Sequence, residues 1–265
     1  MTSLSQESVA VASILEDWRS RHRHWSLMEV FLPVSQRQQA PYLFAWYEAI
    51  ESATFEVNDD AVALAKLRWW RDELNFATEG KARHPLMQVC SPLIGRISGS
   101  WDAVVDAALR LRMTQPRPAN LQESWQAVEI LAGAQSNLEQ ALWGGREDSA
   151  WRCADLLLTR LRRHAGPHAE RSLLPLDLCA RHALPVELIE LGSSEPHQRG
   201  WQLDWVSALN QEMPQQDIAR ARASTLWSVA TRLHLRALAN PQQRQVTTMA
   251  AWVWHAWQSA RRAAG

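Results

Sequence analysis

The sequence predicts an all-α protein, and three features carry this prediction. The first is composition: the 265 residues include only 10 Gly, two Tyr and four Phe, whereas Ala, Leu, Arg and Gln are abundant. The second is apolar residues at helical spacing, as in Trp151, Ala154, Leu157, Leu158 and Leu161. The third is the Pro, Gly and cap residues that separate such stretches.

Helices are expected between these breaks. Pro33 closes one helix, Asn120 caps another, and Gly144 ends the helix that Asn120 begins. Gly166-Pro167 stops the next one, and residues 192–196 form the longest loop-like patch. The expected helices are 5–18, 25–32, 36–56, 60–78, 85–98, 101–112, 121–143, 147–164, 214–239 and 242–262.

Charge and hydropathy exclude several classes of function. The 28 basic and 28 acidic residues give a formal charge of zero, so no nucleic-acid partner is expected. No apolar run approaches the roughly 20 residues that span a bilayer, and residues 1–16 lack the pattern of a signal peptide. A cytoplasmic protein is expected. The three cysteines, Cys90, Cys153 and Cys179, are interpreted as reduced, buried thiols.

Aromatic and basic residues leave a membrane contact open. The chain has 15 Trp, which favour either helix packing or a membrane–water interface. Packing is the preferred interpretation because charged residues interrupt every Trp cluster. The one dense basic run, Arg19 to Trp25, is interpreted as a solvated helix face, with diphosphate or acidic lipid as the alternative ligand. Peripheral membrane contact is thus kept as a possibility.

Several segments share one order with a known family. They are Pro33 to Arg37, Tyr42 to Phe55, Lys66-Leu-Arg-Trp-Trp-Arg-Asp-Glu-Leu74, Leu131-Ala-Gly-Ala134 and Arg171-Ser-Leu-Leu-Pro-Leu-Asp-Leu178. Together they resemble squalene and phytoene synthases, which condense two allylic diphosphates head to head. The resemblance covers roughly residues 20–190. It implies a single domain over 1–265, a helical bundle around a central cavity of the isoprenoid synthase type.

The resemblance also shows where the metal-binding motifs are altered. The family holds Mg²⁺ with aspartates one helical turn apart, a spacing that puts hard oxygen ligands on one face. Those positions fall on Glu51, Ser52 and Phe55, so Glu51 is the only remnant, with Tyr47 and Glu48 expected at the same cavity. The aspartates of the second motif fall on Arg162 and Gly166. No metal site is therefore expected.

Other residues at these positions suggest substitute roles. Glu48, Glu51 and Asp155 together could hold one Mg²⁺, whereas the simpler interpretation pairs the glutamates with arginines or places them in water. Glu51 and Arg162 could form an ion pair across the cavity. The resemblance places Arg37, Arg162, Arg163 and Arg171 beside the diphosphate site, where they could bind an anion bidentately.

The sequence thus predicts a divergent, catalytically inactive squalene/phytoene synthase-like protein that acts in binding or assembly. This is similar to the phytoene-synthase-like assembly factors of respiratory complex I. One alternative is an active prenyltransferase, which would need Mg²⁺; otherwise no cofactor is expected. A second alternative is a carrier of isoprenoid phosphates or lipids. The expected partner is a protein, or an isoprenoid diphosphate or lipid.

Overall fold

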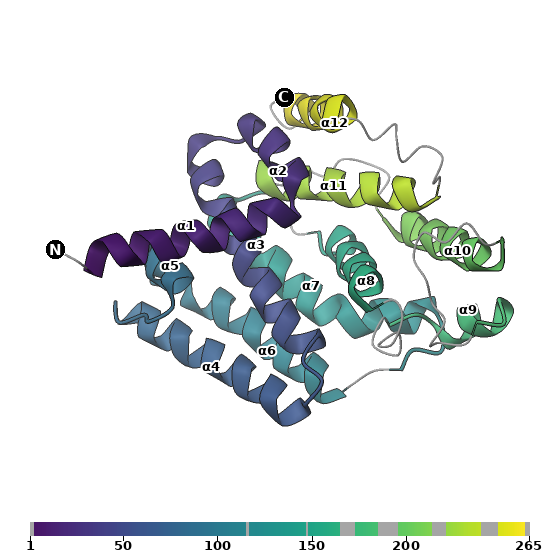
Figure 1. Ribbon diagram of the computed structural model, residues 1–265, viewed down its shortest axis with the longest axis horizontal. Helices are drawn as coiled ribbons and strands as arrows, with labels where there is room; N and C mark the ends of the chain where they lie inside the picture. The colour runs from purple at the N-terminus through teal and green to yellow at the C-terminus, as the bar shows by residue number, and fades with distance from the viewer. Residues whose placement is uncertain are drawn as a thin grey trace.

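The computed structural model describes residues 3–114, 117–146, 148–164, 173–184, 196–213, 221–239 and 249–262. Side chains are described for 9–114, 117–146, 148–161, 173–184, 200–213, 221–239 and 250–261. All the secondary-structure elements in this part of the chain are helices, which confirms the all-α prediction (Figure 1). The elements are α1 Ser3–Arg21, α2 Arg23–Met28, the 3₁₀ turn η1 Glu29–Phe31, α3 Val34–Phe55, α4 Asp60–Thr78, α5 Pro85–Ile94, α6 Ser98–Thr114, α7 Leu121–Trp143, α8 Ala150–His164, α9 Leu176–Arg181, α10 Pro196–Glu212, α11 Arg222–Ala239 and α12 Met249–Arg262.

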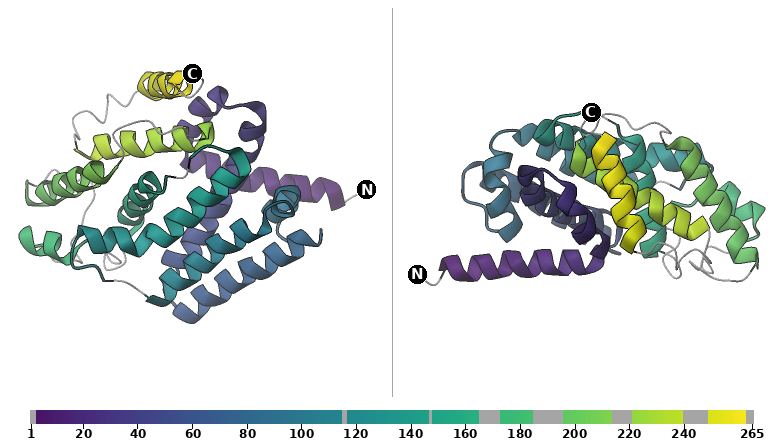
Figure 2. Two further views of the ribbon diagram at one scale, coloured as in Figure 1. Left: turned by 180° about the vertical axis from the view of Figure 1, so that it is seen from behind. Right: turned by 90° about the horizontal axis from the view of Figure 1, so that it is seen from above.

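The helices pack as a series of neighbours from one edge of the molecule to the other. Helix α4 packs on α6, α6 on α7, α7 on α8, α8 on α11 and α11 on α12. Helix α3 crosses this series and contacts α4, α6 and α11. Figure 1 shows α4 and α6 at one edge, α7 and α8 in the middle and α12 at the opposite edge. The view from above shows α1 lying along one side (Figure 2). This arrangement brings α1, α3, α8 and α11 around one central point.

Tryptophans fill much of the interior, as the packing interpretation predicts. One hydrophobic cluster contains buried residues of helices from α1 to α12. Its largest fully buried side chains include seven indoles: Trp18, Trp25, Trp46, Trp101, Trp151, Trp201 and Trp205. By contrast, Trp69, Trp254 and Trp257 are exposed.

Local signals set several helix boundaries correctly. The Asp59 carboxylate accepts a hydrogen bond from the Val62 N–H at 2.9 Å and begins α4. The Asn120 side chain accepts from the Glu123 N–H at 3.0 Å and begins α7. Gly144 ends α7 with φ of 75°, a left-handed conformation that suits glycine. Helices α4 and α7 therefore match the predicted ranges 60–78 and 121–143.

Helices α9 and α10 are not among the helices predicted from the sequence. The loop-like patch at 192–196 ends in Pro196, which is the first residue of α10 and suits a first helical position. The buried side of α10 carries Trp201, Gln202, Trp205, Val206 and Leu209, so a polar residue lies within its apolar stripe. Residues 214–220 and 242–248, which fall in the two last predicted helices, lie outside the described residues.

A buried carboxylate fixes the turn between α4 and α5. Glu73 has no exposed surface. It accepts hydrogen bonds from the backbone N–H groups of Arg83 (2.9 Å) and His84 (2.8 Å), and from Arg83 Nε (2.7 Å). Burial acts to raise the pKa of Glu73, but the hydrogen bonds from His84 and Arg83 outweigh it and the pKa is lowered.

Glu73→Gln should lower the free energy of unfolding at neutral pH by about 1–3 kcal/mol, because it removes the charge that three donors stabilise. The folded-state pKa lies below the ordinary 4.5, so this stabilisation is present above pH 4.5 and is lost as the pH falls through the folded value. Urea unfolding at pH 7 and at acidic pH should therefore show a difference that shrinks on acidification. The control is Glu79→Gln, at an exposed acid of the same segment. An equal loss in both variants would contradict this account.

Candidate functional site

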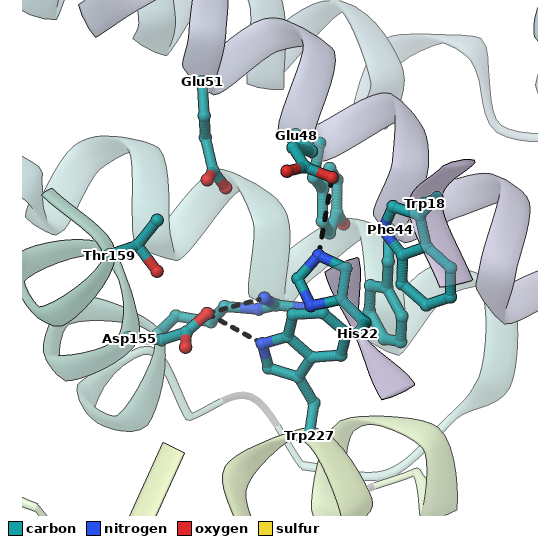
Figure 3. A pocket seen from close by; sticks show the side chains of 10 residues that line it. Trp18, His22, Phe44, Glu48, Glu51, Asp155, Thr159 and Trp227 are labelled. Atoms are coloured by element: carbon teal, nitrogen blue, oxygen red, sulfur yellow. Dashed lines mark hydrogen bonds and ion pairs between the residues drawn. The ribbon is translucent and has the colours of Figure 1, made fainter. Parts of the chain in front are cut away.

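A small cavity lies where α1, α3, α8 and α11 meet. Its volume is about 30 Å³, which is the share of one water molecule in the liquid and far below the roughly 300–1,000 Å³ of ligand pockets. Figure 3 shows Glu48, Glu51, Asp155 and Thr159 around it. Its lining residues are Trp18, His22, Phe44, Tyr47, Glu48, Glu51, Arg152, Asp155, Thr159 and Trp227.

Helix α3 supplies one wall of the cavity through Phe44, Tyr47, Glu48 and Glu51. Tyr47 is buried, and its hydroxyl donates to the Gln135 carbonyl of α7 at 2.9 Å. The side-chain amide of Gln135 donates to Glu51 Oε1 at 3.0 Å. The wall is thus tied to α7 by two hydrogen bonds, and one oxygen of Glu51 already accepts a hydrogen bond from the protein.

Glu48 is held by the end of α1. Arg21 donates from Nε and Nη2 to the two oxygens of Glu48 at 3.3 and 3.2 Å, and His22 Nε2 lies 3.4 Å from Oε2. Arg21 also pairs with Asp17. The basic run is therefore not a solvated face throughout: Arg21 and His22 turn toward α3, and Trp25 is fully buried. This matches the simpler interpretation of Glu48, in which it pairs with an arginine.

Asp155 faces α3 from α8, and both of its oxygens accept hydrogen bonds. Oδ1 accepts from the Thr231 hydroxyl at 2.8 Å, and Oδ2 accepts from the Trp227 indole N–H at 2.8 Å. Arg152 Nη1 lies 3.5 Å from Oδ2 (Figure 3). Two helices therefore supply the donors that hold this carboxylate, α8 itself and α11.

Arg152 is the charged centre of the site. Its side chain is 2% exposed and that of its partner Glu139 is 4% exposed. Arg152 Nε donates to Glu139 Oε1 at 2.9 Å, Nη2 donates to the same oxygen, and the Ser224 hydroxyl donates to Oε2. The guanidinium also lies over aromatic rings, at distances of 4.2 to 5.8 Å. Those rings belong to Phe44, Tyr47, Trp151 and Trp227. Such a setting suits Arg because it binds carboxylates and stacks on rings.

Burial dominates the acid–base properties of this region. It raises the pKa of Tyr47 well above its ordinary value, and the nearby Glu139 carboxylate adds to the effect. Although burial opposes it, the carboxylates of Glu139 and Asp155 raise the pKa of Arg152, so this side chain stays charged. Burial also raises the pKa of Cys90 and Cys153 to about 12, so these free thiols are not activated nucleophiles.

The carboxylates are arranged for hydrogen bonding within the protein. Among the described residues, no group of three His, Cys, Asp or Glu side chains is placed to hold a metal ion. A cation between Glu51 and Asp155 would have to share the Asp155 oxygens with the donors of Thr231 and Trp227. It would also lie near the positive charge of Arg152, and like charges repel strongly where water is excluded.

The remaining motif positions on α3 have separate roles. Ser52 donates to Glu56 Oε2 at 2.6 Å and faces an outer groove. Phe55 is buried, and the Arg160 guanidinium lies 3.8 Å from the centre of its ring. A carboxylate at position 55 would therefore lie in the core rather than in the cavity. The sequence at this end of α3 serves packing.

Of the four arginines proposed for anion binding, the structure describes the side chain of Arg37. Arg37 donates from Nη2 to the carbonyls of Val30 (2.9 Å) and Leu32 (3.1 Å) and supports the turn before α3. Arg162 and Arg163 belong to α8, but their side chains are outside the described residues, as are Gly166 and Arg171. Anion binding by these residues, and the pairing of Glu51 with Arg162, stay predictions.

A larger groove opens on the neighbouring face of α3 and shares Trp18 and Glu48 with the small cavity. It has a volume of about 740 Å³ and lies between α1, α3 and α5. Its charged residues are mainly acidic, with Asp17, Glu48 and Glu56 around Arg21. This charge disfavours a diphosphate. Its lining residues are Ile14, Asp17, Trp18, Arg21, Ala45, Glu48, Ala49, Ser52, Glu56, His84 and Leu86.

Sequence reasoning missed the residues that hold the carboxylates. Gln135 and Glu139 are polar residues one turn apart on the buried side of α7, and Arg152 immediately follows Trp151 on the buried side of α8. Polar residues inside an apolar stripe are a signal of internal pairing, because burying them unpaired is costly. That signal does not identify which residue pairs with which.

No family model matches the chain, and no curated protein matches it. Two solved structures are similar in fold. One is the squalene synthase HpnC from Alicyclobacillus acidocaldarius, with 15% identity, a TM-score of 0.56 and coverage of 91% of this chain and 95% of that one. The other is a dehydrosqualene synthase in complex with ligand, with 12% identity, a TM-score of 0.61 and coverage of 98% and 96%. The chain therefore has the all-α fold of the isoprenoid synthase type.

Removing one member of the buried ion pair should lower the free energy of unfolding far more than removing both members. Arg152→Met leaves Glu139 buried without its cation and should lower the free energy of unfolding by about 3–5 kcal/mol. The double variant Arg152→Met/Glu139→Leu should recover most of that loss, because no charge then stays buried. Urea unfolding of both single variants and the double variant measures the coupling.

The matched control is the exposed pair of Arg181 and Asp177 on α9, 4.0 Å apart. Arg181→Met should change stability by about 1 kcal/mol or less, because water already screens that pair. Purely additive losses in the Arg152 and Glu139 variants would show that the two side chains do not depend on each other.

Proposed function

We propose that this protein is a catalytically inactive member of the squalene/phytoene synthase-like proteins and that it acts in binding or assembly. One observation carries the proposal. The acids that face the central cavity, Glu48, Glu51 and Asp155, accept hydrogen bonds from Arg21, Gln135, Thr231 and Trp227. These donors orient the acids for pairing within the protein, so a metal that carried the diphosphate would have to share the acids with them.

The size of the cavity supports the same proposal. Its volume of about 30 Å³ admits water, whereas two allylic chains would need a pocket of the size that ligands occupy. At this point the Trp227 ring packs against the rings of Trp18 and Phe44, with centroid distances of 6.0 and 4.6 Å. Opening the cavity would separate these rings and expose Arg152.

A protein partner fits this proposal better than a prenyl substrate. With its interior filled by its own side chains, the protein presents its surface as the interacting part. The assembly role that the sequence resemblance implies needs a stable helical body and no chemistry in the cavity. In this proposal the protein uses no metal or other cofactor.

The second candidate is an active prenyltransferase with substitute ligands. It is favoured by one observation: Glu48, Glu51 and Asp155 point into the same cavity from two helices (Figure 3). Catalysis would require Arg21 and Arg152 to move away so that Mg²⁺ could enter. The third candidate, a carrier of isoprenoid phosphates or lipids, depends on Arg162, Arg163 and Arg171, and an assay without metal tests it.

The protein should form no hydrocarbon from farnesyl or geranylgeranyl diphosphate in the presence of Mg²⁺ and NADPH. Labelled substrate is incubated with the protein and the organic extract is analysed, with a known squalene synthase as the positive control. Metal-dependent product that disappears in the Asp155→Asn variant would establish the second candidate and refute the proposal.

Thermal unfolding tests metal and substrate binding separately from turnover. Millimolar Mg²⁺, alone or with farnesyl diphosphate, should shift Tm by less than about 1 °C. A ligand at a hundred times its Kd would add about 2.7 kcal/mol to the free energy of unfolding and would raise Tm by several degrees. A rise with farnesyl diphosphate alone would favour the carrier, and a rise that needs both ligands would favour the enzyme.

A further inference from the structure

The outer side of α12 is apolar although it faces water. Trp254 is 55% exposed, Val253 38% and Trp257 36%. Ala250 and Arg261 are also exposed, and together these five residues are spaced as a single stripe along the helix. We call this stripe the outer face of α12. The opposite side packs inward through Trp252, Ala256 and Ser259.

The two outer tryptophans form one continuous patch. Their ring centroids are 5.1 Å apart, and the Arg261 guanidinium lies 4.9 Å from the Trp257 ring. A buried aromatic side chain removes roughly 150–250 Å² from water, so two adjacent exposed indoles keep a large apolar area hydrated. Single exposed apolar residues need no explanation, but a joined aromatic patch indicates a contact surface.

The charged residues around this face are mainly basic. Helix α12 packs on α2, η1 and α11. The sequences of α2, α11 and α12 contain one, three and two arginines, and no Asp or Glu. Arg23 and Arg236 are exposed. The acid of η1, Glu29, lies 3.4 Å from Arg19. In a chain with no net charge, this edge is therefore locally positive.

We propose that the outer face of α12 docks on an anionic membrane surface, with the helix lying in the plane of the interface. Trp and Arg are the residues that prefer the boundary between headgroups and acyl chains. Anionic lipids attract the surrounding arginines. No helix of the described part is long and apolar enough to cross a bilayer, so the contact is peripheral. This inference is independent of whether the cavity is catalytic.

Two protein occupants fit the surface less well. A second copy of the chain, joined about a two-fold axis with the two α12 helices parallel, would bring Arg261 of one helix toward Arg261 of the other. Like charges brought together in this way oppose association. Another protein would need an acidic apolar groove of matching length, whereas an anionic bilayer offers both chemistries everywhere on its surface.

Vesicle flotation tests the proposal with the full chain. Vesicles of phosphatidylcholine alone are compared with vesicles that contain about 30% phosphatidylglycerol, because the attraction depends on anionic lipid. The protein should float with the anionic vesicles, and binding should fall at least tenfold between about 0.05 and 0.5 M salt. Trp254→Ser/Trp257→Ser should reduce binding by at least about tenfold, and Arg261→Gln by about fivefold.

The matched control is Trp69→Ser, which removes from α4 an indole about as exposed as that of Trp257. It should float as well as the unchanged protein, and circular dichroism verifies that each variant is folded. Equal flotation of the double Trp variant, or no flotation of the unchanged protein, would overturn the proposal. A concentration-dependent dimer in sedimentation velocity that the double Trp variant abolishes would assign the surface to a second copy instead.

Discussion

The site depends on one buried ion pair, Glu139 with Arg152. Taking two charges out of water costs several kcal/mol each, and only close pairing with further hydrogen bonds offsets that cost. Here Ser224 satisfies the second oxygen of Glu139 and aromatic rings surround the guanidinium. The pair joins α7 to α8, and through Ser224 it also fixes α11. The positions of Asp155 and Trp227, and hence the small size of the cavity, follow from this pairing.

The same pair underlies the proposal that this fold serves a different use here. The similar solved structures are named as squalene and dehydrosqualene synthases, yet the centre of this bundle holds a protein cation with its own carboxylate partners. A fold is a scaffold whose activity depends on the site. In the function proposed above, the centre contributes stability and the surfaces that serve function are on the outside, at the groove beside α1 and at α12.

The sequence predicts the helices better than it predicts the site. Helices α4 and α7 have clear caps and broad apolar stripes, so their bounds follow from local chemistry. Helix α10 is missed because its first residue, Pro196, ends a loop-like patch, and because the polar Gln202 lies within its buried stripe. The facing of Glu51 and Asp155 follows from helical spacing together with the family resemblance. The pairing of Glu139 with Arg152 does not, because it depends on how α7 and α8 pack, which local sequence does not specify.

The most direct measurement is a crystal structure of the protein grown with Mn²⁺ and farnesyl diphosphate, with anomalous scattering used to locate the metal. Mn²⁺ reports any site that Mg²⁺ would occupy. The account predicts no anomalous peak between Glu51 and Asp155, an intact pair of Glu139 and Arg152, and Trp227 still bonded to Asp155. A metal bound by those carboxylates, with diphosphate beside it and Arg152 displaced, would contradict it.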